Sequence, residues 1–247
     1  MKKIKIRGLY FDNVTMREAL VFAERSLAEE RAVCIFTPNA EIAQLALENE
    51  DVMHLMNGAD LLLPDGAGIL LASEILKTPL TEKVAGIDFG MGVLSLASEK
   101  GYPVFLLGGK PTVAETAAEK LKTKFPALQI VGMHDGYFEK TGEENDRVIR
   151  QINDSGAEIL FVCFGAPTQE TWITENKHRL PGVRLLAGLG GSLDVYAEAV
   201  KRAPSFFIRA RLEWFYRLLQ EPKRLKRMMK LPRYILGTYR ERFFSKR

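Results

Sequence analysis

The chain has 247 residues, of which 47% are hydrophobic and 27% charged, as is typical of a globular protein with one or two domains. Its longest apolar run, near residues 159–167, is shorter than the roughly 18–20 residues that a membrane-spanning helix needs. The N-terminus turns charged and polar too early for a signal peptide, so we expect a cytoplasmic protein. Cys34 and Cys163 stand in apolar runs, which predicts buried, reduced thiols.

Charge is distributed unevenly along the chain. Residues 201–247 hold 15 Lys or Arg and 3 Glu, a net charge of +12, whereas residues 1–200 hold 20 basic and 28 acidic residues, a net charge of −8. A basic tail on an acidic body indicates an anionic partner for the tail, such as membrane phospholipid, nucleic acid or a phosphorylated substrate.

Residues 1–200 alternate between short apolar runs and segments of helical period. The predicted strands are residues 4–11, 33–37, 60–63, 104–107, 129–133, 159–164 and 184–187. The predicted helices are residues 16–29, 40–48, 69–76, 91–100, 113–124, 143–155 and 169–179. This alternation predicts a Rossmann-like α/β domain, with a mainly parallel sheet and helices on both faces.

Helix-start and helix-stop signals support these boundaries. Thr15 with Glu18, and Thr141 with Glu144, fit the spacing of a capping box. The sequence Gly101-Tyr102-Pro103 indicates a helix end.

The pattern changes after residue 200. Residues 205–220 have an amphipathic helical period, Pro222 interrupts it, and residues 223–247 mix basic, aromatic and aliphatic side chains. We therefore predict a second unit, a basic amphipathic helical appendage over residues 201–247. Because the sheet pattern ends before it, residues 1–200 are expected to fold without this appendage.

Polar residues and glycines follow the predicted strands, at the edge of a parallel sheet where ligands bind. Asp65, in Pro64-Asp65-Gly66, is either an ordinary turn residue or a general base in a cleft. Asn39 and Gln169 are either helix-cap residues or substrate-binding residues. Thr37 is the last residue of a predicted strand and would lie at the same edge of the sheet. The stretches Gly108-Gly109 and Gly188–Gly191 indicate either phosphate-binding turns or plain strand–helix turns.

No metal or cofactor is predicted. The three histidines have no ligand spacing, and no Asp-x-Asp sequence occurs. The chain also lacks G-x-G-x-x-G, which disfavours the alternative of a dinucleotide-binding oxidoreductase. A membrane-surface adaptor that binds a nucleotide without chemistry is a third alternative.

The arginines of the appendage include Arg217, Arg224 and Arg227, which would share one face of a continuous helix. They form either a solvated basic face or a site for bidentate phosphate recognition. Aromatic residues among them suit a membrane interface, and no nucleic-acid-binding module is recognisable. We expect a membrane-surface partner and no nucleic acid.

Five stretches together resemble the WecG/TagA/CpsF glycosyltransferases, in order over nearly the whole chain. They are TPNAEI (37–42), PDGAGI (64–69), FGAPTQETWI (164–173), GLGGSLDV (188–195) and the basic stretch 201–227. The likeness is strongest to the branch that acts in wall teichoic acid synthesis.

The resemblance implies an inverting, metal-independent hexosyltransferase at the inner face of the bacterial plasma membrane. Its donor would be UDP-N-acetylmannosamine (UDP-ManNAc), its acceptor N-acetylglucosamine (GlcNAc)-diphospho-undecaprenol, and its product a β-1,4 linkage. Asp65 matches the family's proposed base, and oligomers that mask the site are proposed for the family. The resemblance also suggests substrate contacts by Thr37, Asn39, Lys83, Gln169, Arg217, Arg224 and Arg227, and we expect nucleotide contacts by Gly108, Gly109, Tyr137, Gly190 and Asp194.

Two positions depart from the resemblance. Lys83 stands where arginine is usual, so the charge is kept but the planar fork is lost. Glu198 stands where we expect glycine. The donor sugar is left open between ManNAc and its uronic acid.

Overall fold

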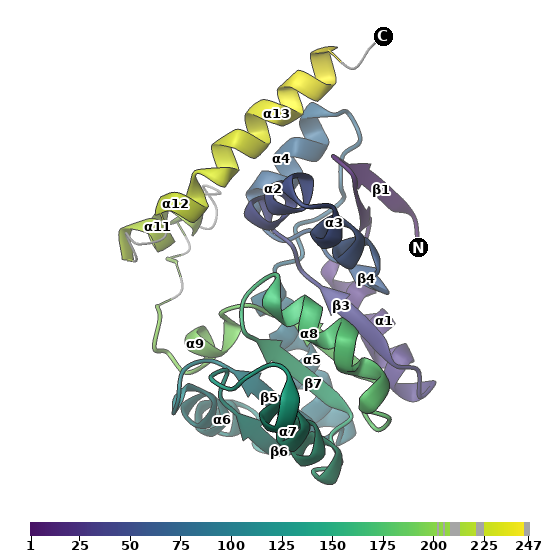
Figure 1. The fold of residues 1–247 in the computed structure, drawn as a ribbon, viewed down its shortest axis with the longest axis vertical. Helices are drawn as coiled ribbons and strands as arrows, with labels where there is room; N and C mark the ends of the chain where they lie inside the picture. Colours follow the sequence, from purple (N-terminus) through teal and green to yellow (C-terminus); the bar gives the residue numbers. More distant parts are fainter. Residues whose placement is uncertain (202, 205, 208–212, 221–224, 245–247) are drawn as a thin grey trace.

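The computed structural model describes residues 1–201, 203–204, 206–207, 213–220 and 225–244. A six-stranded sheet forms its centre, with strand order β4-β3-β8-β7-β5-β6 and parallel pairing throughout (Figure 1). Its strands are β3 (Val33–Phe36), β4 (Leu61–Leu62), β5 (Val104–Gly108), β6 (Ile130–His134), β7 (Ile159–Cys163) and β8 (Leu185–Gly188). This arrangement confirms the predicted fold class.

Helices cover both faces of the sheet, and each face has its own buried apolar cluster (Figure 1). One cluster includes residues of α2 (Ala40–Glu48), α3 (Glu50–Asn57), α4 (Ala67–Ile75), α7 (Gly142–Asp154), α8 (Thr168–Asn176) and α13 (Lys230–Phe244). The other includes residues of α1 (Met16–Ala28), α5 (Gly86–Lys100), α6 (Val113–Lys124) and α9 (Ser192–Tyr196). Cys34 and Cys163 are free and buried in these clusters, as predicted.

The first predicted strand, residues 4–11, is wrong as a single element. The chain instead forms an antiparallel hairpin of β1 (Lys3–Ile6) and β2 (Leu9–Asp12), separate from the main sheet. The turn residues Arg7 and Gly8 have φ angles of 47° and 93°. Two consecutive positive φ values are typical of a tight hairpin turn. The alternating apolar pattern continues on both sides of this turn and therefore conceals it.

Several helices differ from the prediction in their bounds or existence. The helix α5 begins at Gly86 rather than at residue 91. The glycines near its start, which suggested a loop, are positions where neighbouring side chains approach the helix closely. A Cβ on Gly90 would lie 2.4 Å from the hydroxyl of Tyr196, and one on Gly92 would lie 2.7 Å from Leu20. The short helices α3 and α9 were not predicted. The polar start of α3 and the glycines before α9 both resemble loops.

The predicted capping box at Thr15 and the predicted helix end at Gly101 are confirmed, whereas the predicted capping box at Thr141 is wrong. Thr15 and Glu18 form the predicted capping box at α1, and Gly101 ends α5 in the left-handed conformation. Thr141 stands at the N-cap of α7 without a side-chain cap hydrogen bond, and Glu144 instead accepts from the backbone N–H of Glu139.

The C-terminal helix α13 packs against α2 and α4 and lies along the same side of the molecule as they do (Figure 1). Tyr234 is fully buried in the first core cluster. Arg7 of the hairpin turn donates to the carbonyl of Tyr234 at 2.9 Å and pairs with Glu241 at 3.3 Å. These contacts place part of residues 201–247 in the core, so we now expect a truncation at residue 200 to destabilise the body.

The remaining described part of the appendage contains α11 (Glu213–Gln220) and α12 (Leu225–Met228). No helix among the described residues is both long and apolar enough to span a bilayer.

Candidate active site

A cavity of about 260 Å³ lies beyond the carboxyl ends of β3, β4, β7 and β8. The strand register explains its position, because Phe36 and Val162 both lie opposite Gly188 and their following loops emerge together. Several residues singled out from the sequence line this one cavity, among them Thr37, Asn39, Asp65, Gln169 and Gly190. The structure thus brings together loops that are far apart along the chain.

Asp65 is partly buried between the end of β4 and the start of α4. Gly66 follows it with a φ of 83°, a conformation that favours glycine and turns the chain into the helix. The first backbone N–H of α5, from Gly86, donates to Oδ2 of Asp65 at 3.3 Å. The amino end of a helix favours negative charge, so this contact stabilises the carboxylate in the cavity.

Thr37 and Gly86 fix the two loops around Asp65. Thr37 Oγ1 donates to the carbonyl of Gly188 at 3.2 Å, which ties the end of β3 to the end of β8. A Cβ on Gly86 would lie 2.6 Å from Thr37 Oγ1, so only glycine allows this approach. The alcohol of Thr37 is therefore held at the floor of the cavity.

Asn39 caps α2, as the simpler of its two interpretations predicted. Its Oδ1 accepts from the backbone N–H groups of Glu41 at 3.0 Å and Ile42 at 3.1 Å. The carbonyl oxygen of the side chain is thus used by the helix, and a substrate contact would come from its amide NH₂.

Gln169 lies in the first turn of α8 and is only 2% exposed. Its Oε1 accepts from the N–H groups of Gly165 and Gly190, at 3.2 and 2.9 Å. The side chain therefore joins the loop after β7 to the loop after β8.

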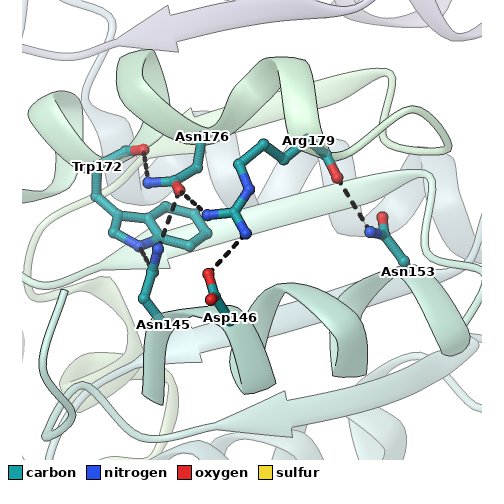
Figure 2. A network of polar contacts seen from close by, with 6 residues as sticks. All are labelled: Asn145, Asp146, Asn153, Trp172, Asn176 and Arg179. Atoms are coloured by element: carbon teal, nitrogen blue, oxygen red, sulfur yellow. Dashed lines mark hydrogen bonds and ion pairs between the residues drawn. The ribbon is translucent and has the colours of Figure 1, made fainter. Parts of the chain in front are cut away.

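A network of polar contacts fixes α8 against α7 (Figure 2). Trp172 Nε1 donates to Asn145 at 2.6 Å, and Asn145 in turn donates to Asn176 at 3.1 Å. Arg179 pairs with Asp146 at 2.7 Å, and its carbonyl accepts from Asn153. Because these bonds hold the body of α8, its first turn has a defined position at the cavity.

Most of the predicted nucleotide-binding residues lie at the same carboxyl edge of the sheet as the cavity but outside it, where Gly108 ends β5. The N–H of Gly136, which precedes Tyr137, donates to the carbonyl of Gly109 at 2.8 Å. Tyr137 itself is 69% exposed. Gly108, Gly109, Tyr137 and Asp194 are not among the residues that line the 260 Å³ cavity, whereas Gly190 and Gly191 are.

The appendage forms one side of the cavity. Glu213 and Trp214 of α11, Met228 of α12 and Leu231 of α13 line it. Sequence reasoning missed these residues, because the periodicity of a helix does not tell which other element its apolar face contacts. The side chains of Arg217 and Arg227, and the whole of Arg224, lie outside the described residues.

Lys83 is not a lining residue of the cavity in the described part of the chain. Its Nζ lies 3.1 and 3.3 Å from the two carboxylate oxygens of Glu213, which links the segment before α5 to α11. A point charge suffices for this contact, so lysine serves as well as the expected arginine.

Glu198 has a φ of 56°, the left-handed region that explains why glycine was expected there. Its carboxylate pairs with Lys120. The backbone conformation is thus kept although the residue type departs from the resemblance.

No three His, Cys, Asp or Glu side chains gather as metal ligands within the residues that the structure describes.

A family profile described as "Glycosyl transferase WecG/TagA/CpsF family" matches residues 4–247. The chain belongs to the WecG/TagA/CpsF family of glycosyltransferases. Membership in this family favours sugar transfer over the oxidoreductase and adaptor alternatives.

Several proteins that share one name are similar to the chain. An N-acetylglucosaminyldiphosphoundecaprenol N-acetyl-beta-D-mannosaminyltransferase of Bacillus spizizenii is 38% identical over 86% of this chain and 80% of its own length. The protein of that name from Bacillus subtilis is 33% identical over 98% and 93%. The one from Staphylococcus aureus is 33% identical over 93% and 89%.

Proposed function

We propose that this glycosyltransferase moves N-acetylmannosamine from UDP-ManNAc to the 4-hydroxyl of GlcNAc-diphospho-undecaprenol. The product would be the β-1,4-linked disaccharide of the wall teichoic acid linkage unit. The names of the similar proteins support this acceptor and this transferred sugar. The observation that carries the chemistry is the carboxylate of Asp65 in the cavity, positioned by the first N–H of α5.

In the proposed reaction, Asp65 takes the proton from the acceptor 4-hydroxyl while that oxygen attacks the anomeric carbon of the donor. The new C–O bond forms as the bond from the anomeric carbon to the β-phosphate oxygen breaks. UDP leaves from the opposite face with the electron pair, so the anomeric configuration inverts. General-base assistance of this kind contributes roughly 10²–10⁴ in rate.

The negative charge that builds on the leaving diphosphate needs stabilisation from the protein. The Gly108-Gly109 turn precedes α6, where backbone N–H groups can approach a phosphate. Tyr137 and Asp194 are proposed to contact the uridine, and Arg217, Arg224 and Arg227 to contact the lipid-linked diphosphate. In this assignment the cavity around Asp65 receives the reacting sugars.

Peripheral attachment to an anionic membrane surface is part of the proposal, because the acceptor is a membrane lipid. Exposed apolar side chains on α11 and α13 support it: Trp214, Phe215, Leu219, Leu236, Tyr239, Phe243 and Phe244. Residues 201–247 also carry a net charge of +12. Basic and aromatic groups together favour the headgroup region of a membrane.

The test compares Asp65→Asn with Asp154→Asn, a control at an exposed position in the last turn of α7. With UDP-ManNAc and a short-chain GlcNAc-diphospho-lipid, Asp65→Asn should lose about 10²-fold or more in kcat while UDP still binds by calorimetry. Near-normal transfer by Asp65→Asn would remove this residue from the role of base.

A second donor is the uronic acid of UDP-ManNAc, which differs from it at one carbon. Assaying both donors with the same acceptor decides between them. Release of UDP from UDP-ManNAc only when acceptor is present would support the proposed reaction.

A further inference from the structure

Glu170 is a buried carboxyl group next to the cavity that the proposed mechanism does not use. Its side chain is 1% exposed, and it follows Gln169 in the first turn of α8. Its Oε1 accepts from Nε2 of Gln169 at 2.8 Å. No described residue donates to its Oε2. A buried carboxyl with an unpartnered oxygen is costly, which calls for a reason specific to this position.

Gln169 itself is almost completely occupied by the protein. Its Oε1 accepts two backbone N–H groups, from Gly165 and Gly190, and so uses both lone pairs of the carbonyl. Its NH₂ group donates one hydrogen to Glu170. A substrate could accept a hydrogen bond only from the one remaining N–H of this group, so the main role of Gln169 is to connect two loops.

Both loops contribute to the same cavity wall. Gly165 and Gly190 line the cavity, and their φ angles of 85° and 56° lie in the left-handed region that favours glycine. Each loop has backbone hydrogen bonds of its own, but Oε1 of Gln169 accepts from an N–H of both loops and so links them directly.

The carboxamide of Gln169 can only make this connection in one of its two orientations. If the group were rotated by half a turn, its NH₂ would face two N–H donors and its oxygen would face a carboxyl group. The two N–H donors favour the correct orientation, and Glu170 adds to this preference by accepting from the NH₂ group. There is also no spare room, since a Cβ on Gly188 would lie 3.0 Å from Nε2 of Gln169 and 3.3 Å from Oε1 of Glu170.

We propose that Glu170 is a positioning residue, which orients the Gln169 carboxamide so that the loops at Gly165 and Gly190 hold the cavity in its reactive shape. Gln169 then contributes to transfer chiefly through the spacing of these loops. The kinetic part of this inference rests on the proposed function, whereas the structural part does not.

Four variants test the inference. Glu170→Leu removes the acceptor, while Glu170→Gln keeps an acceptor oxygen. Gln169→Glu places two carboxyl groups within hydrogen-bond distance of each other. The exchange Gln169→Glu/Glu170→Gln restores the pattern, because Glu at 169 still accepts the two N–H groups and Gln at 170 donates to it.

A matched control exists in α2. Nε2 of the buried Gln44 donates to Oε1 of Glu48 at 2.9 Å, and neither residue lines the 260 Å³ cavity. Gln44→Glu therefore places a second carboxyl group beside Glu48 away from the two loops, where Lys230 and Arg233 pair with Glu48.

The first readout is amide hydrogen exchange, followed in peptides covering residues 164–168 and 188–192. Glu170→Leu and Gln169→Glu should speed exchange in both peptides by about tenfold, the effect of losing roughly one hydrogen bond. Glu170→Gln and the double variant should stay close to the wild type, and so should Gln44→Glu. Thermal melts of every variant separate this local effect from global unfolding, which would raise exchange everywhere.

The second readout is the kinetics of transfer from UDP-ManNAc to the short-chain lipid acceptor. Glu170→Leu and Gln169→Glu should lower kcat/KM by about tenfold, and the double variant should recover most of this loss. Unchanged exchange in Glu170→Leu, or a double variant no better than Gln169→Glu in exchange, would overturn the proposal. If the wild-type protein transfers no sugar from this donor, the proposed function fails while the exchange experiment still decides the role of Glu170.

Discussion

The strongest prediction about the fold concerns Tyr234, because it decides whether the C-terminal helix belongs to the core. Tyr234 is fully buried, and Arg7 lies over its ring at 5.0 Å from the centroid. Truncating a fully buried aromatic side chain to alanine costs about 3–5 kcal/mol. For a chain of this size each kcal/mol corresponds to about 2–4 °C in Tm, so Tyr234→Ala should lower Tm by roughly 6–20 °C. Urea unfolding followed by circular dichroism gives the free energy directly.

Two control variants test whether burial of the Tyr234 ring causes the loss of stability in Tyr234→Ala. Tyr234→Phe keeps the ring and removes a hydroxyl that is buried with no hydrogen-bond partner among the described residues, so stability should equal or exceed that of the wild type. Tyr239→Ala, at a 46% exposed position five residues further along α13, should change stability by about 0.5 kcal/mol or less. If Tyr234→Ala were as harmless as Tyr239→Ala, α13 would not be part of the core in solution.

Two further predictions concern pH and membranes. Burial raises the pKa of Glu170 from 4.5 to about 7, so its contribution to stability is full below pH 4.5 and is lost as pH rises through 7, by on the order of 3 kcal/mol. Unfolding measured from pH 4.5 to 8 should therefore show Glu170→Gln gaining on the wild type by that order as pH rises, and a constant difference would contradict the burial argument. On α13, Leu236 and Phe243 are 66% and 70% exposed, so Leu236→Ser/Phe243→Ser should keep the wild-type Tm but sediment less with vesicles containing phosphatidylglycerol. Equal sedimentation of this variant and the wild type would exclude α13 as the membrane-contacting helix.

The loops of the cavity could be predicted because strand ends are visible in the sequence. Thr37, Asp65 and Gln169 each follow an apolar run, and parallel strands present their carboxyl ends at one edge. The order of strands could not be predicted in this way. β8 lies between β3 and β7, although it is the last strand in the chain, and this insertion brings Gly188 beside Thr37 and Gln169.

The role of Glu170 could not be predicted from the pattern of its neighbours. It lies in the stretch Thr168-Gln169-Glu170-Thr171, whose polarity is typical of a solvent-exposed helix start. Within it only Gln169 and Glu170 are buried, at the place where Gln169 contacts the loops after β7 and β8. Long-range packing of this kind leaves no periodic signal, and the same reason concealed the inner face of α13, where Tyr234 and Thr238 are buried.

The packing of α13 also changes how the appendage should be tested. Besides its apolar packing, α13 forms ion pairs with the body: Lys230 and Arg233 pair with Glu48 at 3.0 and 2.8 Å, and Arg7 pairs with Glu241. A truncation at residue 200 removes these contacts together with Tyr234, so loss of activity in it would mix unfolding with loss of the cavity wall. Substitutions on α11 avoid this confusion, because Glu213 and Trp214 line the cavity without belonging to either core cluster. The function of the appendage is therefore best separated from its structural role at Glu213 and Trp214 of α11, which line the cavity and stand outside both core clusters.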